Sequence, residues 1–139
     1  MDFETYRKNY YTDPQPESRF DLGAGIRGAV LYYQDYPAAL DFYTRVFGPP
    51  NYVEGDHTHG WRLGESWLTL FPSKSGSPGN IEVPFYLPTR EAADALFAAL
   101  IEAGAQGDPP AETLMYRPVY MAIVTDPFGV TLDLVCEVG

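Results

Sequence analysis

The two histidines of the chain, His57 and His59, stand two residues apart in a segment with the composition of a β-strand. Side chains at positions i and i+2 of a strand lie on one face, so the two imidazoles could bind the same metal ion. A solvated pair near the start of an exposed strand is the competing interpretation, and the sequence leaves both open. Two ligands are too few for a zinc centre, so the metal interpretation needs donors from other segments.

The residues that serve other common reactions are missing or isolated. Cys136 is the single cysteine and lies near the end of a predicted strand with no assigned histidine partner, so we expect it to be inert. The chain has no Gly-x-Ser-x-Gly motif, and its LGAGIRG run, residues 22–28, precedes a strand, which excludes a phosphate-binding loop.

Residues 1–24 differ from the rest and form a predicted aromatic arm. Phe3, Tyr6 and Tyr10 share one face of a short predicted helix, which Pro14 and Pro16 end. We expect the arm to pack on the domain or on a partner subunit, with a lid over a pocket as the alternative.

The next segment contains a strand, a helix and two further strands. The strand falls within 25–35, the helix covers 38–48, and the later strands cover 57–63 and 66–71. The apolar face of the helix consists of Ala39, Phe42, Tyr43, Val46 and Phe47.

The second half has the same plan. It has a strand at 81–87, a helix at 90–104 that Thr89 caps, an irregular connection at 106–116 and a hairpin at 119–135 with a DPFG turn. The predicted buried face of this helix consists of Ala93, Leu96, Phe97, Leu100 and Ile101.

An internal repeat relates the two halves. A shift of 54 residues pairs Tyr32 with Tyr86 and matches the apolar faces of the two helices, and a shift of 64 pairs Leu68 with Leu132. We therefore predict an α+β fold of two βαβββ modules, at about 25–72 and 80–138, in a single domain at 25–139.

Two motifs carry a resemblance to a known family. VLYYQDYPAALDFYTRVFG, residues 30–48, and TDPFGVTLDLV, residues 125–135, resemble the first strand and helix and the closing strand of the vicinal oxygen chelate superfamily, which includes glyoxalase I, bleomycin-resistance proteins and extradiol dioxygenases. The resemblance covers about 26–137. It implies an open curved sheet that forms a cup, with the pocket on the concave face, and a homodimer with the cup at or near the interface.

The resemblance also implies four metal-ligand positions, two per module, which in this chain fall on Gly28, Thr69, Glu82 and Asp133. Glycine cannot ligate and threonine is a poor ligand, so the site is degenerate and we expect no cofactor. A divalent metal held by His57, His59, Glu82 and Asp133 stays open as an alternative. Glu82 and Asp133 are also candidates for a general acid and base.

Strand alternation gives the predicted lining of the cup, in which aromatic rings and two carboxylates suit a flat or cationic organic ligand. We expect Arg62, Arg117 and Tyr116 on the surface, with the rim of the cup as the alternative, where an inward Arg117 would pair with Glu82 or Asp133. The predicted ligand-binding residues are Tyr32, Trp67, Thr69, Phe71, Glu82, Tyr86, Thr131 and Asp133.

Charge and composition exclude several function classes. The net charge of −10 and the pI near 4.4 disfavour nucleic acid and anionic membranes. We find no signal peptide or membrane span in the sequence, and one cysteine suits a reducing compartment, so we expect a cytoplasmic protein.

The sequence therefore predicts a small-molecule-binding protein that resembles glyoxalases and bleomycin-resistance proteins and has lost its metal site. Two alternatives stay open: a divalent-metal-dependent lyase, isomerase or dioxygenase of the same superfamily, and a non-catalytic protein-interaction module.

Overall fold

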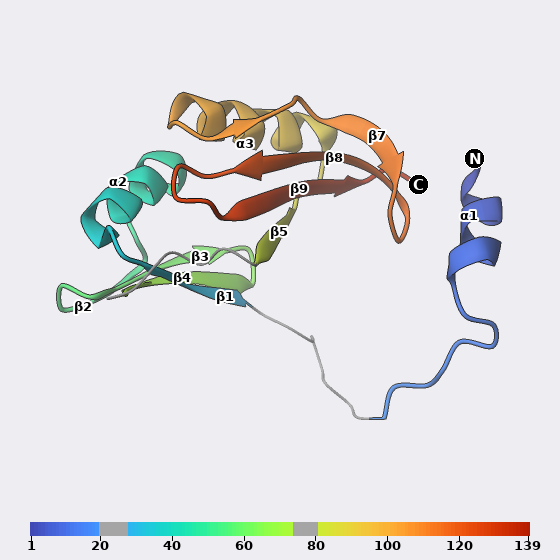
Figure 1. Ribbon diagram of the computed structural model, residues 1–139, viewed down its shortest axis with the longest axis horizontal. Helices are drawn as coiled ribbons and strands as arrows, with labels where there is room; N and C mark the ends of the chain where they lie inside the picture. Colours follow the sequence, from blue (N-terminus) through green and yellow to red (C-terminus); the bar gives the residue numbers. More distant parts are fainter. Residues whose placement is uncertain (20–27, 74–80) are drawn as a thin grey trace.

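The computed structural model describes residues 1–19, 28–73 and 81–139 (Figure 1). The short helix α1 (Phe3–Tyr10) stands apart from two sheets that carry the other two helices. The first module consists of β1 (Gly28–Tyr33), α2 (Tyr36–Phe47), β2 (Tyr52–Glu54), β3 (Thr58–Leu63) and β4 (Ser66–Pro72). Its strands form one sheet in the order β1-β4-β3-β2.

The second module begins with β5 (Glu82–Tyr86) and α3 (Arg90–Glu102). It continues with β6 (Gln106–Gly107), β7 (Ala111–Leu114), β8 (Pro118–Thr125) and β9 (Thr131–Glu137). Its sheet has the order β5-β9-β8-β6, with β7 also paired to β8. Each module thus returns from a helix to end on a strand parallel to its first, as a βαβββ unit requires.

The strand registers reproduce the sequence repeat. Gly28 pairs with Trp67 in the first sheet, and Glu82 pairs with Thr131 in the second. These two pairs are related by the same shifts of 54 and 64 residues that align the halves of the sequence. The predicted α+β fold of two βαβββ modules is confirmed, and both sheets are open.

Two strand assignments differ from expectation. The segment 106–116, predicted to be irregular, contains β6 and β7, and β2 was not predicted as a separate strand. Pro109 and Pro110 divide β6 from β7, because proline lacks the amide hydrogen that a continuous strand would supply. The prolines made this segment look irregular in the sequence, although it forms an edge strand in two pieces, β6 and β7.

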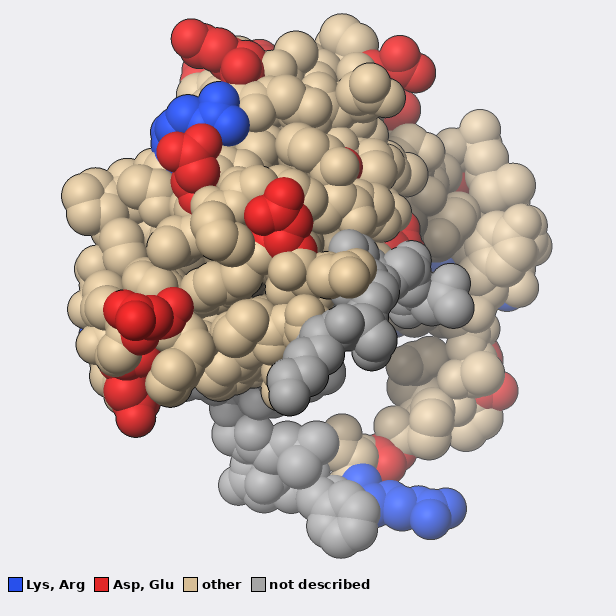
Figure 2. Space-filling view, turned by 60° about the vertical axis from the view of Figure 1, so that its left-hand side comes forward, with Lys and Arg blue, Asp and Glu red and all other residues tan. Residues whose placement is uncertain are grey.

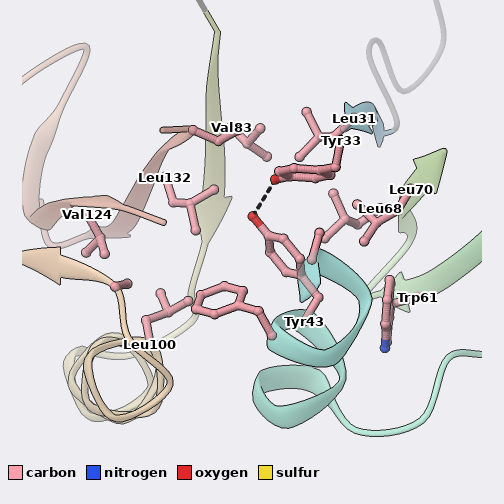
Figure 3. Close-up of a cluster of buried hydrophobic side chains, with 14 of the residues drawn as sticks. Leu31, Tyr33, Tyr43, Trp61, Leu68, Leu70, Val83, Leu100, Val124 and Leu132 are labelled. Atoms are coloured by element: carbon pink, nitrogen blue, oxygen red, sulfur yellow. Dashed lines mark hydrogen bonds between the residues drawn. The ribbon is translucent and has the colours of Figure 1, made fainter. Parts of the chain in front are cut away.

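The helix-facing sides of both sheets share one hydrophobic core (Figure 3). Tyr33 and Leu31 from β1 meet Val83 and Leu132 from the other sheet there, and Phe47 of α2 contacts Phe85 of β5 with 5.7 Å between ring centroids. In α3 only Ala93 and Leu100 of the predicted face are fully buried. Ile101 is 37% exposed, because the face that packs on β8 and β9 is narrower than the apolar stripe.

The turn residue Asp126 links the two modules. It is only 3% exposed, and its Oδ2 accepts hydrogen bonds from the hydroxyls of Tyr33 and Tyr43 at 2.8 and 2.7 Å. Its Oδ1 accepts from the backbone amides of Phe128 and Val130, both at 2.9 Å. Burial and the nearby Asp126 charge raise the pKa of Tyr33, while burial, the Tyr33 hydroxyl and then Asp126 raise that of Tyr43, so both remain donors.

None of the helices in the described ranges is long and apolar enough to span a bilayer.

We predict that Asp126→Ala lowers the free energy of unfolding by about 3 kcal/mol or more, because it leaves buried hydroxyl and amide groups without acceptors. Urea titration followed by far-UV circular dichroism would measure this change. Asp94→Ala is the matched control, because Asp94 also accepts a tyrosine hydroxyl, that of Tyr120 at 2.6 Å, but at the surface. It should cost about 0.5–1 kcal/mol. Equal losses for the two variants would contradict the assigned role of Asp126.

Candidate functional site

The predicted ligand-binding residues lie on the outer faces of the two sheets, which we define as the sides turned away from the shared core. On the first sheet, Tyr32 and Phe71 are cross-strand partners, and their rings stack at a centroid distance of 5.4 Å. Trp67 and Thr69 lie on the same face of β4, alternating with the buried Leu68 and Leu70. Tyr32 is 52% exposed and Trp67 39%, so this face presents aromatic surface to solvent.

A glycine makes room for the exposed tryptophan. A Cβ atom at Gly60 would lie 3.4 Å from Cε3 of Trp67 and 3.6 Å from Oγ1 of Thr69. These are ordinary contact distances, so the indole covers the β3 backbone where no side chain intervenes. Arg62, two residues on, is exposed on the same face as the cross-strand partner of Trp67.

At Gly28 the backbone of β4 lies much closer than any neighbour of Gly60 does. A Cβ atom there would lie 2.4 Å from the carbonyl oxygen of Trp67, a distance that real Cβ atoms do not show. Any side chain at this position would therefore require the β1 and β4 backbones to move apart. The implied metal-ligand position of the first strand is closed by backbone geometry as well as by residue type.

The outer face of the second sheet carries the two predicted acids. Glu82 pairs with Thr131 and Asp133 pairs with Pro84, so the acids lie on adjacent strands, two positions apart in register. Tyr86 continues the same face of β5 and is 56% exposed. Thr131 and Asp133 alternate with the buried Leu132 and Leu134.

Asp133 has an unusual environment. Its Oδ1 is buried and has no hydrogen-bond partner in the described part of the chain. Burial, and secondarily the charge of Glu82, raise the pKa of the Asp133 carboxyl. No ion pair between described residues neutralises either acid. A buried acceptor beside a second carboxylate, with no ion pair from the described residues, favours a positively charged or proton-donating group at this position.

The structure divides the predicted lining into two groups. Tyr32, Trp67, Thr69 and Phe71 belong to the first sheet, and Glu82, Tyr86, Thr131 and Asp133 to the second. Within the described ranges, no hydrogen bond, ion pair or ring contact joins one group to the other. A single chain therefore presents two half-sites.

The histidines lie apart from both acids. His57 is exposed in the turn before β3, where its Nδ1 is 3.1 Å from the Thr58 hydroxyl. His59 pairs with Leu70 and lies on the core side, with its Nδ1 2.5 Å from the Tyr36 hydroxyl, which is also 3.1 Å from the Leu70 carbonyl oxygen. Because that hydroxyl has one proton and the carbonyl can only accept, Nδ1 of His59 is the donor to Tyr36 when Tyr36 donates to Leu70.

The residues present do not fit a metal centre. Among the described residues no three His, Cys, Asp or Glu side chains are grouped to hold an ion. Of the four implied positions, Gly28 has no side chain, Thr69 is a weak donor, and Glu82 and Asp133 supply two carboxylates. The set of His57, His59, Glu82 and Asp133 is not brought together, because His59 faces the core and the acids face outward.

Several further residues of the outer faces were not in the predicted set, among them Tyr52, which pairs with Gly60 and is 48% exposed. Val30 and Ile123 are 49% and 56% exposed, and Arg62 is exposed beside Trp67. Strand alternation would have found Val30, which stands between Gly28 and Tyr32, and Ile123, which pairs with Asp133. Arg62 has the same signal but was assigned to the general surface.

We predict that Gly28→His destabilises the protein by about 1–3 kcal/mol and gains no zinc binding, because the side chain cannot enter without displacing β4. Thermal unfolding and calorimetric titration with zinc would measure the two effects. Gly60→Ala is the control on the same face, where the added methyl meets only ordinary contacts and should cost less than about 1 kcal/mol. A stable Gly28→His variant that binds zinc would overturn the backbone argument.

Comparison with known proteins identifies the architecture. Solved structures with this fold include a glyoxalase/bleomycin resistance protein from Albidiferax ferrireducens, with a TM-score of 0.70 and 18% identity over 81% of this chain and 98% of that one. A family enzyme from Burkholderia phytofirmans gives 0.64 and 21% over 81% and 98%. A lactoylglutathione lyase from Agrobacterium tumefaciens gives 0.62 and 19% over 82% and 94%. At these identities the likeness shows the fold alone.

No curated protein matches the chain in sequence. The family model described as Glyoxalase/Bleomycin resistance protein/Dioxygenase superfamily matches residues 25–134, which span both modules and both half-sites. The chain therefore belongs to the glyoxalase/bleomycin resistance protein/dioxygenase superfamily.

Proposed function

We propose that the chain is a cytoplasmic small-molecule-binding protein of this superfamily that takes a cationic aromatic ligand without a metal. The observation that carries the proposal is the Asp133 carboxylate, whose Oδ1 is buried beside Glu82 and has no hydrogen-bond partner among residues 1–19, 28–73 and 81–139. A positively charged nitrogen would satisfy that oxygen and relieve the repulsion between the two acids.

The aromatic half-site supports a flat ligand body. Tyr32, Phe71 and Trp67 present ring surface on one face, and aromatic rings stack on flat molecules and attract cations. The two half-sites are thus chemically different, one apolar and one anionic. A ligand with a flat body and a cationic end matches both.

A homodimer would bring the half-sites together. Large apolar side chains are exposed on both outer faces, among them Trp67 on the first sheet and Ile123 on the second. The faces are also complementary in charge, since Arg62 lies on the first, and Glu82 and Asp133 lie on the second. We therefore propose that the first sheet of one copy faces the second sheet of its partner.

Free edges support the same pairing. Within the described ranges β1 and β5 are each hydrogen-bonded to one neighbour only, so each leaves an edge on which another strand can align. Exposed apolar surface of this kind commonly marks an interface.

For the ligand, we predict that benzamidinium binds several-fold more tightly than benzamide, its neutral counterpart of the same shape, as measured by Trp fluorescence and calorimetry. Glu82→Gln should weaken benzamidinium binding by about three- to tenfold and leave benzamide unaffected, because one charged hydrogen bond is worth about 1–2 kcal/mol. Glu102→Gln, the same charge change on the exposed side of α3, is the control. Equal affinity for both ligands would refute a cation site.

We also predict that benzamidinium binding weakens as the pH falls through the raised pKa of Asp133. The carboxylate must be ionised to hold the cation, and burial makes it take up a proton at a higher pH than an ordinary aspartate does. Affinity measured from neutral to acidic pH should therefore fall, and Asp133→Asn should flatten this dependence. A pH profile unchanged by Asp133→Asn would show that another group controls binding.

For assembly, we predict a dimer at micromolar concentration in sedimentation equilibrium. Ile123→Glu should weaken it at least tenfold, because the new charge lies next to Asp133 on the proposed interface. Ile101→Glu, an isoleucine exposed on α3, should leave the dimer intact. A monomeric wild-type protein, or equal effects of the two substitutions, would refute the pairing of outer faces.

A further inference from the structure

We propose that the cavity between the arm and the turn that joins β7 to β8 is a second binding site, which takes a small organic ammonium cation. The cavity has a volume of about 340 Å³ and is separate from both outer-face half-sites. Figure 1 shows α1 beside the β7–β8 turn and the C-terminus. The cavity is lined by Tyr6, Tyr10, Tyr11, Thr12, Gln15 and Tyr116.

Hydrogen bonds hold the walls of this cavity. The hydroxyl of Tyr11 donates to the backbone carbonyl of Tyr116 at 2.5 Å, which joins the arm to the domain across more than one hundred residues of sequence. The side-chain amide of Gln15 donates to the carbonyl of Thr12 at 2.7 Å and contacts its hydroxyl at 3.2 Å, which folds the segment after α1 into a turn. One hydrogen bond therefore joins the two sides of this open cavity, and two more fix the arm segment that borders it.

The lining favours a cation over an anion or a neutral apolar group. Four of its six residues are tyrosines, whose ring faces carry negative electrostatic potential, and none is charged. The rings of Tyr6 and Tyr10 lie 4.9 Å apart at 57°, so they form an angled corner. The guanidinium of Arg7 lies 5.8 Å from the centre of the Tyr11 ring, so this ring is already used by a cation of the chain, and we assign the ligand to Tyr6 and Tyr10.

The charge of the chain acts in the same direction. Nineteen acidic residues against nine basic ones give −10, and Figure 2 shows acidic side chains distributed over the face it presents. Such a surface raises the local concentration of cations and repels anions. The volume of this cavity is close to the smallest volumes found for small-ligand pockets, which suits a compact ammonium group.

The arm packs only loosely on the domain, so a bound ligand is expected to change how the arm is held. No residue of α1 is buried, and a helix of eight residues is marginal without packing. A ligand that fills the cavity would contact the arm and the turn at once. Binding at this site is therefore expected to order the arm against the domain.

The test compares choline with 3,3-dimethyl-1-butanol, which has the same shape without the charge, by calorimetric titration of the full chain. Choline should bind about three- to thirtyfold more tightly, the range that cation–π attraction provides. Equal binding of the two compounds, or no binding of choline, would overturn the proposal.

Variants then locate the site. Tyr10→Ala, at a residue that is 66% exposed, should weaken choline binding about three- to tenfold without unfolding the protein, and Tyr10→Phe should retain most of it, because phenylalanine keeps the ring. Tyr52→Ala, at an exposed tyrosine outside the cavity, is the matched control. Choline affinity that is insensitive to Tyr10→Ala would overturn the site.

The Tyr10→Ala and Glu82→Gln variants together show whether choline binds in this cavity or at the outer-face carboxylates. Tyr10→Ala should leave benzamidinium binding unchanged. If choline affinity instead falls with Glu82→Gln and not with Tyr10→Ala, the cation binds at the carboxylate pair, and the cavity proposal is wrong while the outer-face proposal stands.

Discussion

The carboxylate of Asp126 is buried between the two modules, and both of its oxygens accept hydrogen bonds, three of them from buried residues and one from the partly buried Phe128. Its Oδ1 shapes the β8–β9 turn, while its Oδ2 receives Tyr33 from β1 and Tyr43 from α2. A buried acid is tolerated only when its acceptors are satisfied, and here two donors come from the opposite module and two from the acid's own turn. The relative position of the modules and the conformation of one turn thus depend on the same side chain.

This arrangement determines where binding chemistry can be placed. Because the core sides of both sheets pack together, the polar and aromatic side chains that are proposed to bind ligands lie on the outer faces and at the arm. The first outer face is aromatic and carries Arg62, and the second carries Glu82 and Asp133. Within one chain the two groups of the expected lining therefore lie on different sheets, and the proposed dimer is the arrangement that would place one group opposite the other.

The fold could be predicted from the sequence because two independent shifts align the apolar positions of the two halves. The alternation of apolar residues along a strand determines its register, so aligned patterns indicate equivalent strands. The faces of Tyr32, Trp67, Glu82 and Asp133 followed from the same alternation. The separation of the half-sites could not be predicted, because alternation within a strand says nothing about which sheets share a core. His59 shows the same limit, since its strand was correct while its hydrogen bond to Tyr36 depends on a helix distant in sequence. The link between Asp126 and the two tyrosines was missed for that reason too.

Because the two modules have matching strand registers, their residues can be compared position by position. Glu82 and Asp133 in the second module occupy the positions that Gly28 and Thr69 occupy in the first. A symmetric pair of modules would hold a symmetric guest equally well in two orientations related by the repeat. Here the second module has two carboxylates at these positions, and the first module has none. The repeat makes the backbones of the two modules equivalent, but their outer faces differ in charge, so the scaffold is electrostatically polar.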